Sequence, residues 1–222
     1  MSEETKYSKL FAEVKNKFSN HNVTMELNEI TLELTSNELI ASCETLKNDP
    51  VFKFDELIDL CGVDYSLFGK NEWETEASTC NGFSRGVNSD ESNQPPVENF
   101  AVVYHLLSLT KNQRIRLKVF LKESDLIIKS VVGIWACADW FEREAFDLFG
   151  ILFEGHEDLR RILTDYGFIG HPFRKDFPLT GHVEMRYDKD KQRVVYEPVN
   201  IEPRTLVPKV IRHNNQHQVD ED

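Results

Sequence analysis

The chain contains few cysteines, and those it has are far apart. Its 222 residues include four, Cys43, Cys61, Cys80 and Cys137, and no two of them form a CxxC pair. Iron–sulfur clusters and structural zinc are held by closely spaced thiolates. The spacing therefore argues against either kind of site in this chain alone, and we expect free thiols in a reducing compartment.

Long apolar segments are also missing, and so is a net positive charge. No run of about 18 apolar residues occurs, and the opening MSEETKYSKLF lacks the layout of a signal peptide. We therefore expect no membrane span. The formal net charge of −12 disfavours nucleic acid as a partner of the chain.

The charge that is present is distributed unevenly. Residues 1–100 carry 8 Lys and Arg against 19 Asp and Glu, whereas residues 159–212 carry 11 against 7. Five of the eight prolines fall in the last 52 residues. Two interpretations stay open: a solvated surface that favours solubility, or a basic arm that docks on an acidic partner.

Hydrophobic periodicity predicts a body made of helices and strands. Apolar residues recur at helical spacing over 7–20 and 36–46. Alternating or continuous apolar patterns predict strands at 23–27, 30–34, 57–65, 100–110 and 114–121. We therefore predict an α+β fold, with a small mixed or antiparallel sheet and flanking helices.

Composition divides the chain into a body and an arm. The predicted body is residues 1–150, and it includes a polar, acidic stretch at 71–99 that is typical of a mobile loop. The predicted arm is residues 151–222, an extended C-terminal docking segment with a candidate β-hairpin across 189–192.

The stretch before the arm predicts two helices. One is short and carries Val131, Ile134 and Trp135. The second opens at Asp139, with Glu142 three residues on as in a capping box. Gly150 fits the left-handed position that follows a helix.

Glu142 occupies an unusual position on the second helix. On a helical wheel it falls in the apolar arc, whereas Glu144 and Asp147 lie on the opposite side. A buried carboxylate must find a partner or raise its pKa. It can cap the helix, pair with Arg160 or Arg161, or act as a catalytic acid.

An ordered set of residues runs along the end of this helix and beyond it. The set is an ERE triplet, an acid before two apolar residues, a histidine, and an arginine before aliphatics: Glu142, Arg143, Glu144, Asp147, Leu148, Phe149, His156, Arg160, Ile162 and Leu163. The run TDYGFIGHPFRKDFP follows it directly. The region 135–188 resembles the 30 kDa subunit family, the C subunits of the proton-pumping NADH:quinone oxidoreductase, respiratory complex I. Looser similarity covers most of the chain, with departures at Glu157 and His182 and in the longer 71–99 loop.

The resemblance implies a role without chemistry of its own. It implies a non-catalytic peripheral-arm subunit that clamps the quinone-reducing D subunit and supports electron transfer from NADH to quinone, coupled to proton translocation. The chain would bind no cofactor, because FMN, iron–sulfur clusters, NADH and quinone belong to other subunits. Its partners would be the D subunit and neighbouring peripheral-arm subunits, at the cytoplasmic face of the bacterial inner membrane.

The stretch 159–178 combines cations and aromatics with glycines and prolines, as recognition segments do. Arginines can make bidentate pairs with partner carboxylates, and aromatics supply rigid buried area. The predicted partner-docking residues are Arg160, Arg161, Tyr166, Phe168, Phe173, Arg174, Lys175 and Phe177. No catalytic, cofactor-binding or metal-binding residue is predicted.

Two rival functions and one rival site remain. The chain could be the homologous scaffold subunit of a membrane-bound hydrogenase or of a photosynthetic-type quinone reductase. It could instead be a hydrolase that uses Glu142, Glu144 and Asp147, which the helical wheel opposes. His156 and His171 could bind a metal with nearby aspartates, but their spacing favours structural histidines bonded to the backbone.

Overall fold

The computed structural model describes residues 3–68 and 98–201, with side chains from Tyr7 onward. The chain forms two compact units, residues 1–66 with 96–179 and residues 67–95 with 180–222. The predicted loop at 71–99 therefore lies, except for its last two residues, outside the described part. None of the described helices is both long enough and apolar enough to cross a membrane.

The first unit is built on a five-stranded sheet with the order β1-β2-β5-β4-β3. Its strands are β1 (Val23–Glu26), β2 (Glu29–Leu34), β3 (Glu56–Asp64), β4 (Phe100–Ser108) and β5 (Gln113–Leu121). All neighbours are antiparallel except β2 and β5, which run parallel. The predicted α+β fold with a mixed sheet is confirmed, and so are the two strands expected at 100–110 and 114–121.

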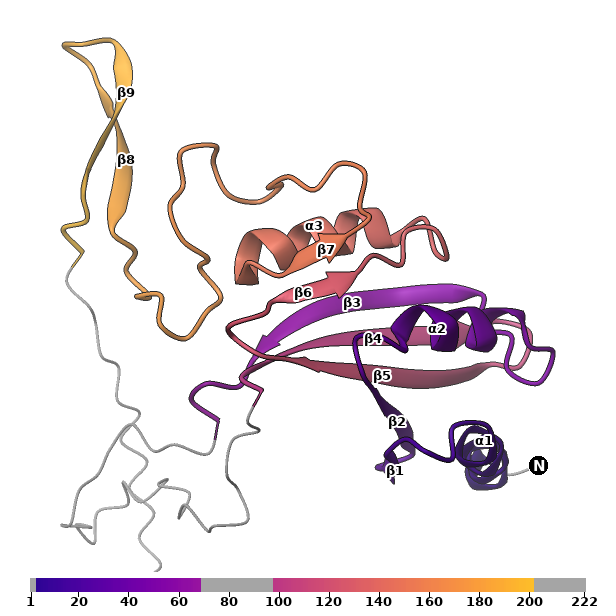
Figure 1. The fold of residues 1–222 in the computed structure, drawn as a ribbon. Coiled ribbons are helices and arrows are strands. Elements are labelled where there is room, and N and C mark those ends of the chain that lie inside the picture. The colour runs from indigo at the N-terminus through magenta and orange to yellow at the C-terminus, as the bar shows by residue number, and fades with distance from the viewer. Residues whose placement is uncertain (1–2, 69–97, 202–222) are drawn as a thin grey trace, which may run out of the picture. The chain divides into compact units, whose positions relative to one another are not determined.

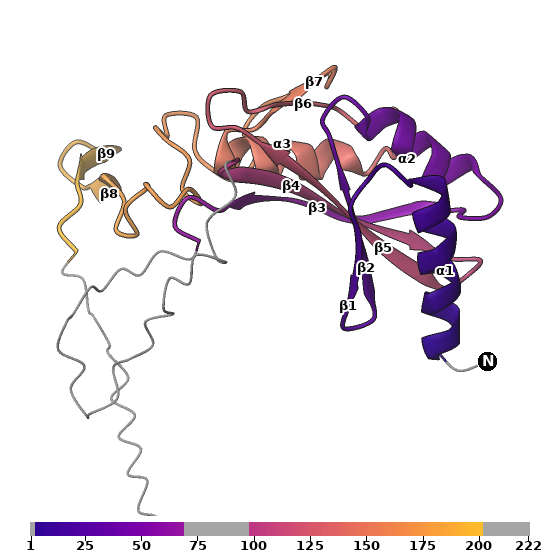
Figure 2. The ribbon, with the colours of Figure 1, turned by 60° about the horizontal axis from the view of Figure 1, so that its bottom comes forward.

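Helices cover one face of this sheet, as Figures 1 and 2 show. They are α1 (Glu3–Lys17), α2 (Leu39–Asn48) and α3 (Ala138–Phe149). One hydrophobic cluster joins buried residues of all three helices to alternate residues of β4, Phe100, Val102, Tyr104 and Leu106. Alternation along a strand sends successive side chains to opposite faces, so the core lies on one side of the sheet.

Two short parallel strands lie on either side of α3 in the sequence, β6 (Ile127–Lys129) and β7 (Leu152–Glu154). The helix expected near Val131 is wrong, because turns precede α3 there. The expected capping box is also wrong. No side chain caps α3, since Asp139 faces His156 and Glu142 accepts hydrogen bonds from the chain before the helix.

The left-handed residue after α3 is confirmed, with a φ of 76° at Gly150. Residues 155–179 then form neither helix nor strand, yet they belong to the first compact unit. That unit therefore extends past residue 150, where composition placed the start of the arm. The reason is a set of polar contacts to α3 and β3, described below.

The described part of the second unit is a β-hairpin, β8 (Val183–Asp188) and β9 (Arg193–Pro198). The hairpin was predicted across 189–192 and is confirmed. Its register pairs Val183 with Pro198, Met185 with Tyr196, and Tyr187 with Val194. These three pairs share one face of the ribbon.

Candidate functional site

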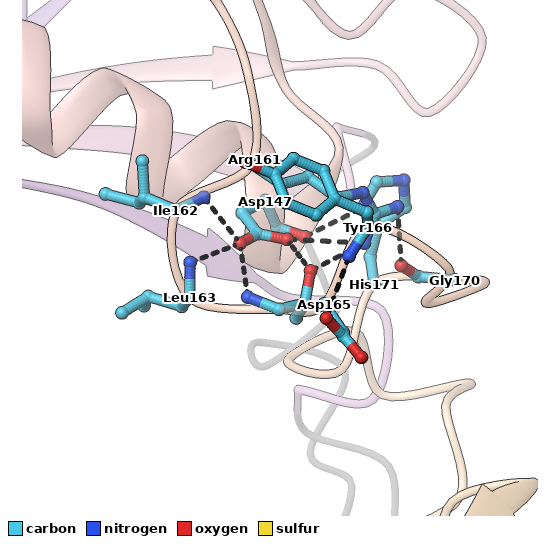
Figure 3. A network of polar contacts seen from close by, with 9 residues as sticks. Asp147, Arg161, Ile162, Leu163, Asp165, Tyr166, Gly170 and His171 are labelled. Atoms are coloured by element: carbon cyan, nitrogen blue, oxygen red, sulfur yellow. Dashed lines mark hydrogen bonds and ion pairs between the residues drawn. The ribbon is translucent and has the colours of Figure 1, made fainter. Parts of the chain in front are cut away.

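The side chain of Asp147, near the end of α3, holds the loop that follows the helix (Figure 3). Its Oδ2 atom accepts hydrogen bonds from the backbone N–H groups of Ile162, Leu163 and Thr164 at 3.1, 2.8 and 2.8 Å. Its Oδ1 atom accepts the Thr164 hydroxyl at 2.5 Å. The carboxylate is fully buried, so it fixes the path of 162–164 from inside the protein.

Arg161 completes this network. Its Nη1 atom lies 3.3 Å from Asp147 Oδ1, and its Nη2 atom donates to the carbonyl of Gly170 at 3.0 Å. Burial alone would raise the pKa of Asp147, but the hydrogen bonds from Thr164, Leu163 and Ile162 outweigh burial and lower it. Asp147 therefore stays charged and ties both ends of the 161–170 loop to α3.

The next residues satisfy the C-terminal carbonyls of α3, which have no partner within the helix. His171 Nδ1 donates to Asp147 O at 2.9 Å, Phe173 N to Leu148 O at 3.1 Å, and Arg174 Nε to Phe149 O at 2.7 Å. The positive charge of Arg174 also interacts favourably with the negative, C-terminal end of the helix dipole. The 171–174 segment thus caps α3 from outside.

A second buried carboxylate attaches the loop to the sheet. Asp64, at the end of β3, accepts a hydrogen bond from the backbone N–H of Lys175 at 2.8 Å and another from Ser66 N at 2.8 Å. The guanidinium carbon of Arg174 lies 5.1 Å from the centre of the Phe100 ring. Residues 161–175 are therefore held by both α3 and the sheet.

Glu142 is fully buried, and its partners are local. Its two oxygens accept the Ser130 hydroxyl and the Val131 backbone N–H, each at 2.7 Å. Burial raises its pKa above the usual range, despite these two hydrogen bonds. The interpretations of Glu142 as a helix cap or as a partner of Arg160 or Arg161 are wrong.

The same contacts bear on the hydrolase hypothesis. Glu142 and Asp147 are both fully buried, and the oxygens of each accept structural hydrogen bonds. Carboxylates that do acid–base catalysis must reach a substrate. This geometry argues against Glu142, Glu144 and Asp147 as a catalytic set.

The two histidines have structural partners. His156 Nε2 lies 3.1 Å from Asp139 Oδ1, while its Nδ1 accepts the backbone N–H of Asp158, so the proton is on Nε2. His171 donates to a helix carbonyl, as described above. Among the described residues, no group of three His, Cys, Asp or Glu side chains could hold a metal ion.

The predicted docking residues separate into two sets. Four have inward contacts: Arg161 and Arg174 bind the chain itself, and Phe168 packs on Phe177 with ring centres 5.7 Å apart. The other four are exposed: Arg160, Tyr166, Phe173 and Lys175. Of these, Phe173 also packs edge-on against Phe149, with ring centres 5.8 Å apart. Tyr166 is 95% exposed, so within this chain it buries almost nothing. Docking itself stays a prediction for all eight.

The hairpin carries a second exposed apolar surface, which we call the hairpin face. Its members are Val183, Met185, Tyr187, Val194, Tyr196 and Pro198. All of these except Pro198 are 53–60% exposed. The opposite face is polar and carries an ion pair between Arg186 and Glu197 at 2.6 Å.

Several of these residues were missed by sequence reasoning. Asp147 and Asp64 were not recognised as loop anchors, and exposed Leu163 and Ile169 were not included among the docking residues. Strand alternation over 183–187 and 194–198 would have identified the hairpin face. No local pattern marks the two anchors, because the loop backbone groups that they bind are 15 to 111 residues away.

The chain has close relatives among known proteins. Residues 32–183 match the sequence profile of a family described as "Respiratory-chain NADH dehydrogenase, 30 Kd subunit". The C subunit of the NADH-quinone oxidoreductase of Legionella pneumophila (strain Lens) is 54% identical over 217 residues, 96% of each chain. The same subunit of Hydrogenovibrio crunogenus (strain DSM 25203 / XCL-2) is 57% identical over 196 residues, 86% of this chain and 87% of the relative.

Two solved structures resemble the fold. A trypsin-resistant fragment (1-134) of Nqo5 is 27% identical, with a TM-score of 0.51, and the match covers 69% of this chain and 99% of the fragment. A chain of the membrane-bound sulfane sulfur reductase, an archaeal respiratory membrane complex, has a TM-score of 0.55 at 18% identity, over 78% of this chain and 86% of the other. The second likeness concerns the fold alone.

Proposed function

The chain belongs to the 30 kDa subunit family of respiratory-chain NADH dehydrogenase, and we propose that it is a non-catalytic docking subunit of NADH:quinone oxidoreductase. Relatives that match nearly the whole chain are named as the C subunit of that enzyme. This favours complex I over the hydrogenase and photosynthetic-type alternatives. In this role the chain contributes contact surface and geometry to the electron path from NADH to quinone.

The finer parts of the proposal concern partners, cofactors and location. The quinone-reducing D subunit is the proposed main partner, with neighbouring peripheral-arm subunits, at the cytoplasmic face of the inner membrane. FMN and iron–sulfur clusters are proposed to lie on other subunits. The separation of the cysteines supports this, since Cys43 lies on α2, Cys61 on β3 and Cys137 before α3.

The observation that carries the docking role is the hairpin face. A two-stranded hairpin is marginally stable in water by itself, and it needs a third layer on its apolar side. Here the apolar side is more exposed than the charged side, where Glu184, Val195 and Glu197 are half-buried. An apolar face in this state is typical of an interface, where aromatic residues and Met are enriched. We therefore propose that the hairpin face packs on a partner subunit.

Adjacent valines of β9 offer a matched test. Val194 belongs to the hairpin face, and Val195 points to the opposite face, across from Arg186. Val194→Glu would place a carboxylate inside an apolar interface, where an unpaired charge is costly to bury. We expect the Val194→Glu chain to be lost from the purified membrane complex and the Val195→Glu chain to be retained.

The measurement is affinity purification of tagged full-length chains from membranes, with mass spectrometry of the co-purified proteins. The D subunit should be among the most abundant of them. Equal retention of both variants would contradict the docking role of the hairpin face. Stoichiometric flavin or iron in the chain purified alone would contradict the proposal that it holds no redox group.

A further inference from the structure

Arg143, in the middle of the ERE triplet, is a buried cation without an ion-pair partner among the described residues. The residue is 5% exposed, and no carboxylate there comes within ion-pair distance of it. Within the described ranges its side chain makes one hydrogen bond, from Nε to the carbonyl of Arg160 at 3.3 Å. A buried guanidinium normally pairs with an anion, because losing water is costly for a charge.

The acidic groups near Arg143 are already engaged with other side chains. Asp158, whose pKa is lowered first by Arg160 and to a smaller extent by Arg143, is bound to Arg160 at 2.8 Å. Asp139, one helical turn before Arg143, faces His156 at 3.1 Å. Glu142 is turned inward to Ser130 and Val131. The Nη atoms of Arg143 are therefore left without a carboxylate.

These Nη atoms still reach solvent. In the described part of the chain, the fully buried side-chain polar atoms that lack a partner are His21 Nδ1 and Tyr104 Oη. The Nη atoms of Arg143 also lack a hydrogen-bond partner there, and since they do not belong to this fully buried group they must be accessible to solvent. Trp140 lies beside this opening: its ring centre is 5.2 Å from the guanidinium carbon, and the residue is 63% exposed. An exposed indole thus covers one side of an unpaired guanidinium.

We propose that Arg143 and Trp140 form a receiving site for a carboxylate side chain of a partner subunit, an inference that rests on the docking function proposed above. The planar fork of an arginine binds a carboxylate in bidentate fashion, and the indole can pack on the stem of the same Asp or Glu. Trp and Arg are also the residue types that dominate interface energies.

The site is continuous with the predicted docking segment. Arg143 holds the backbone of Arg160, whose side chain pairs with Asp158, and exposed Tyr166 follows six residues along the chain. A partner acid bound at Arg143 would therefore lie next to the exposed part of 159–178. The signature triplet would then combine an internal anchor, Glu142, with an external receptor, Arg143.

A competition experiment tests the site in the whole complex. Wild-type and variant full-length chains with different tags are co-expressed, and their ratio is measured in the purified membrane complex. Truncating one partner of a buried charge pair weakens binding by about 30-fold or more. Arg143→Met should therefore fall to less than about a tenth of the wild-type chain. Arg114→Met, which removes an exposed arginine of β5, should stay near equal ratio.

A second variant addresses folding and identifies the partner group. Arg143→Lys keeps the charge and supplies an amine that a zero-length carbodiimide reagent can join to a carboxylate. Mass spectrometry should find an amide between position 143 and an Asp or Glu of another subunit. A link only to Asp139 or Asp158 of the same chain, or no link at all, would overturn the proposal.

The outcomes separate this inference from the function on which it rests. If the wild-type chain joins no membrane complex, the docking function itself fails. If the wild-type chain is retained but Arg143→Met competes equally, or position 143 forms no link to another subunit, only the carboxylate site fails.

Discussion

Asp147 illustrates how one buried carboxylate can order a long irregular loop. Its two oxygens receive three backbone N–H groups, one hydroxyl and one guanidinium. Hydrogen bonds to a charged group are stronger than neutral ones. The loop has no regular secondary structure, so these contacts replace the backbone hydrogen bonds that a helix or strand would provide.

Asp147→Asn is the residue-scale prediction. The amide keeps one acceptor and adds two donors, which would face the N–H groups of 162–164. We expect the free energy of unfolding at pH 7 to fall by about 3 kcal/mol. Urea denaturation of the full chain measures it, with Asp158→Asn as the exposed control, whose pair with Arg160 should matter little.

The effect of Asp147 should depend on pH in a defined direction. The folded-state pKa lies below the ordinary value of 3.8, so the stabilisation is present above that value. It is lost as the pH falls through the folded pKa. The difference between wild type and Asp147→Asn should therefore shrink as the pH falls below about 3.8. A constant difference across this range would contradict the assignment.

At the scale of elements, the contact between α3 and β3 depends on a glycine. A Cβ atom at Gly62 would lie 2.6 Å from Cδ2 of Phe149 and 3.2 Å from Cδ1 of Ile151. The helix end and the strand therefore meet closely where the loop of 161–175 is also attached. Any displacement of α3 there would move Asp147 and the carbonyls that the loop caps.

Gly62→Ala is the element-scale prediction. The added methyl group has to push Phe149 or Ile151 aside, and overpacking of this kind costs about 1–3 kcal/mol. Gly133→Ala is the matched control, because nothing lies within 4 Å of a Cβ atom there. Thermal unfolding should show a lower Tm for Gly62→Ala only. Equal Tm values would mean that α3 and β3 do not need this close approach.

At the scale of the whole molecule, the chain consists of one unit that ends at Leu179 and another that holds the hairpin. The first unit contains the five-stranded sheet, the three helices and the 161–175 loop. Its core is one hydrophobic cluster made only of first-unit residues. Stability is therefore assigned to the first unit, whereas the hairpin of the second unit is proposed to serve docking alone.

Truncation after Leu179 is the whole-molecule prediction. The 1–179 chain should unfold cooperatively with nearly the Tm of the full chain, because the core cluster lies entirely in the first unit. In the cell, however, it should be largely absent from the purified membrane complex. Calorimetry and quantitative mass spectrometry of membranes give the two readouts. Loss of folding, or normal incorporation, would each contradict the division of roles.

Local patterns determined the elements and the family of this protein. A continuous apolar run marked β4, alternation marked β5, the turn at 189–192 marked the hairpin, and Gly150 marked the end of α3, because each signal lies within a few neighbouring residues. The ordered set from Glu142 to Leu163 was enough to indicate the 30 kDa family. Those conclusions needed no knowledge of distant contacts.

Tertiary structure alone decided where the arm begins and which polar residues are internal. Asp147 and Asp64 bind backbone groups up to 111 residues away, so residues 161–175 join the body although their composition resembles a docking arm. Arg161 became an internal anchor, while Arg143 was left buried and unpaired in the described chain. Periodicity reports which side of an element is apolar. Only the folded chain shows which polar groups find partners, because hydrogen bonds between distant segments leave no periodic trace.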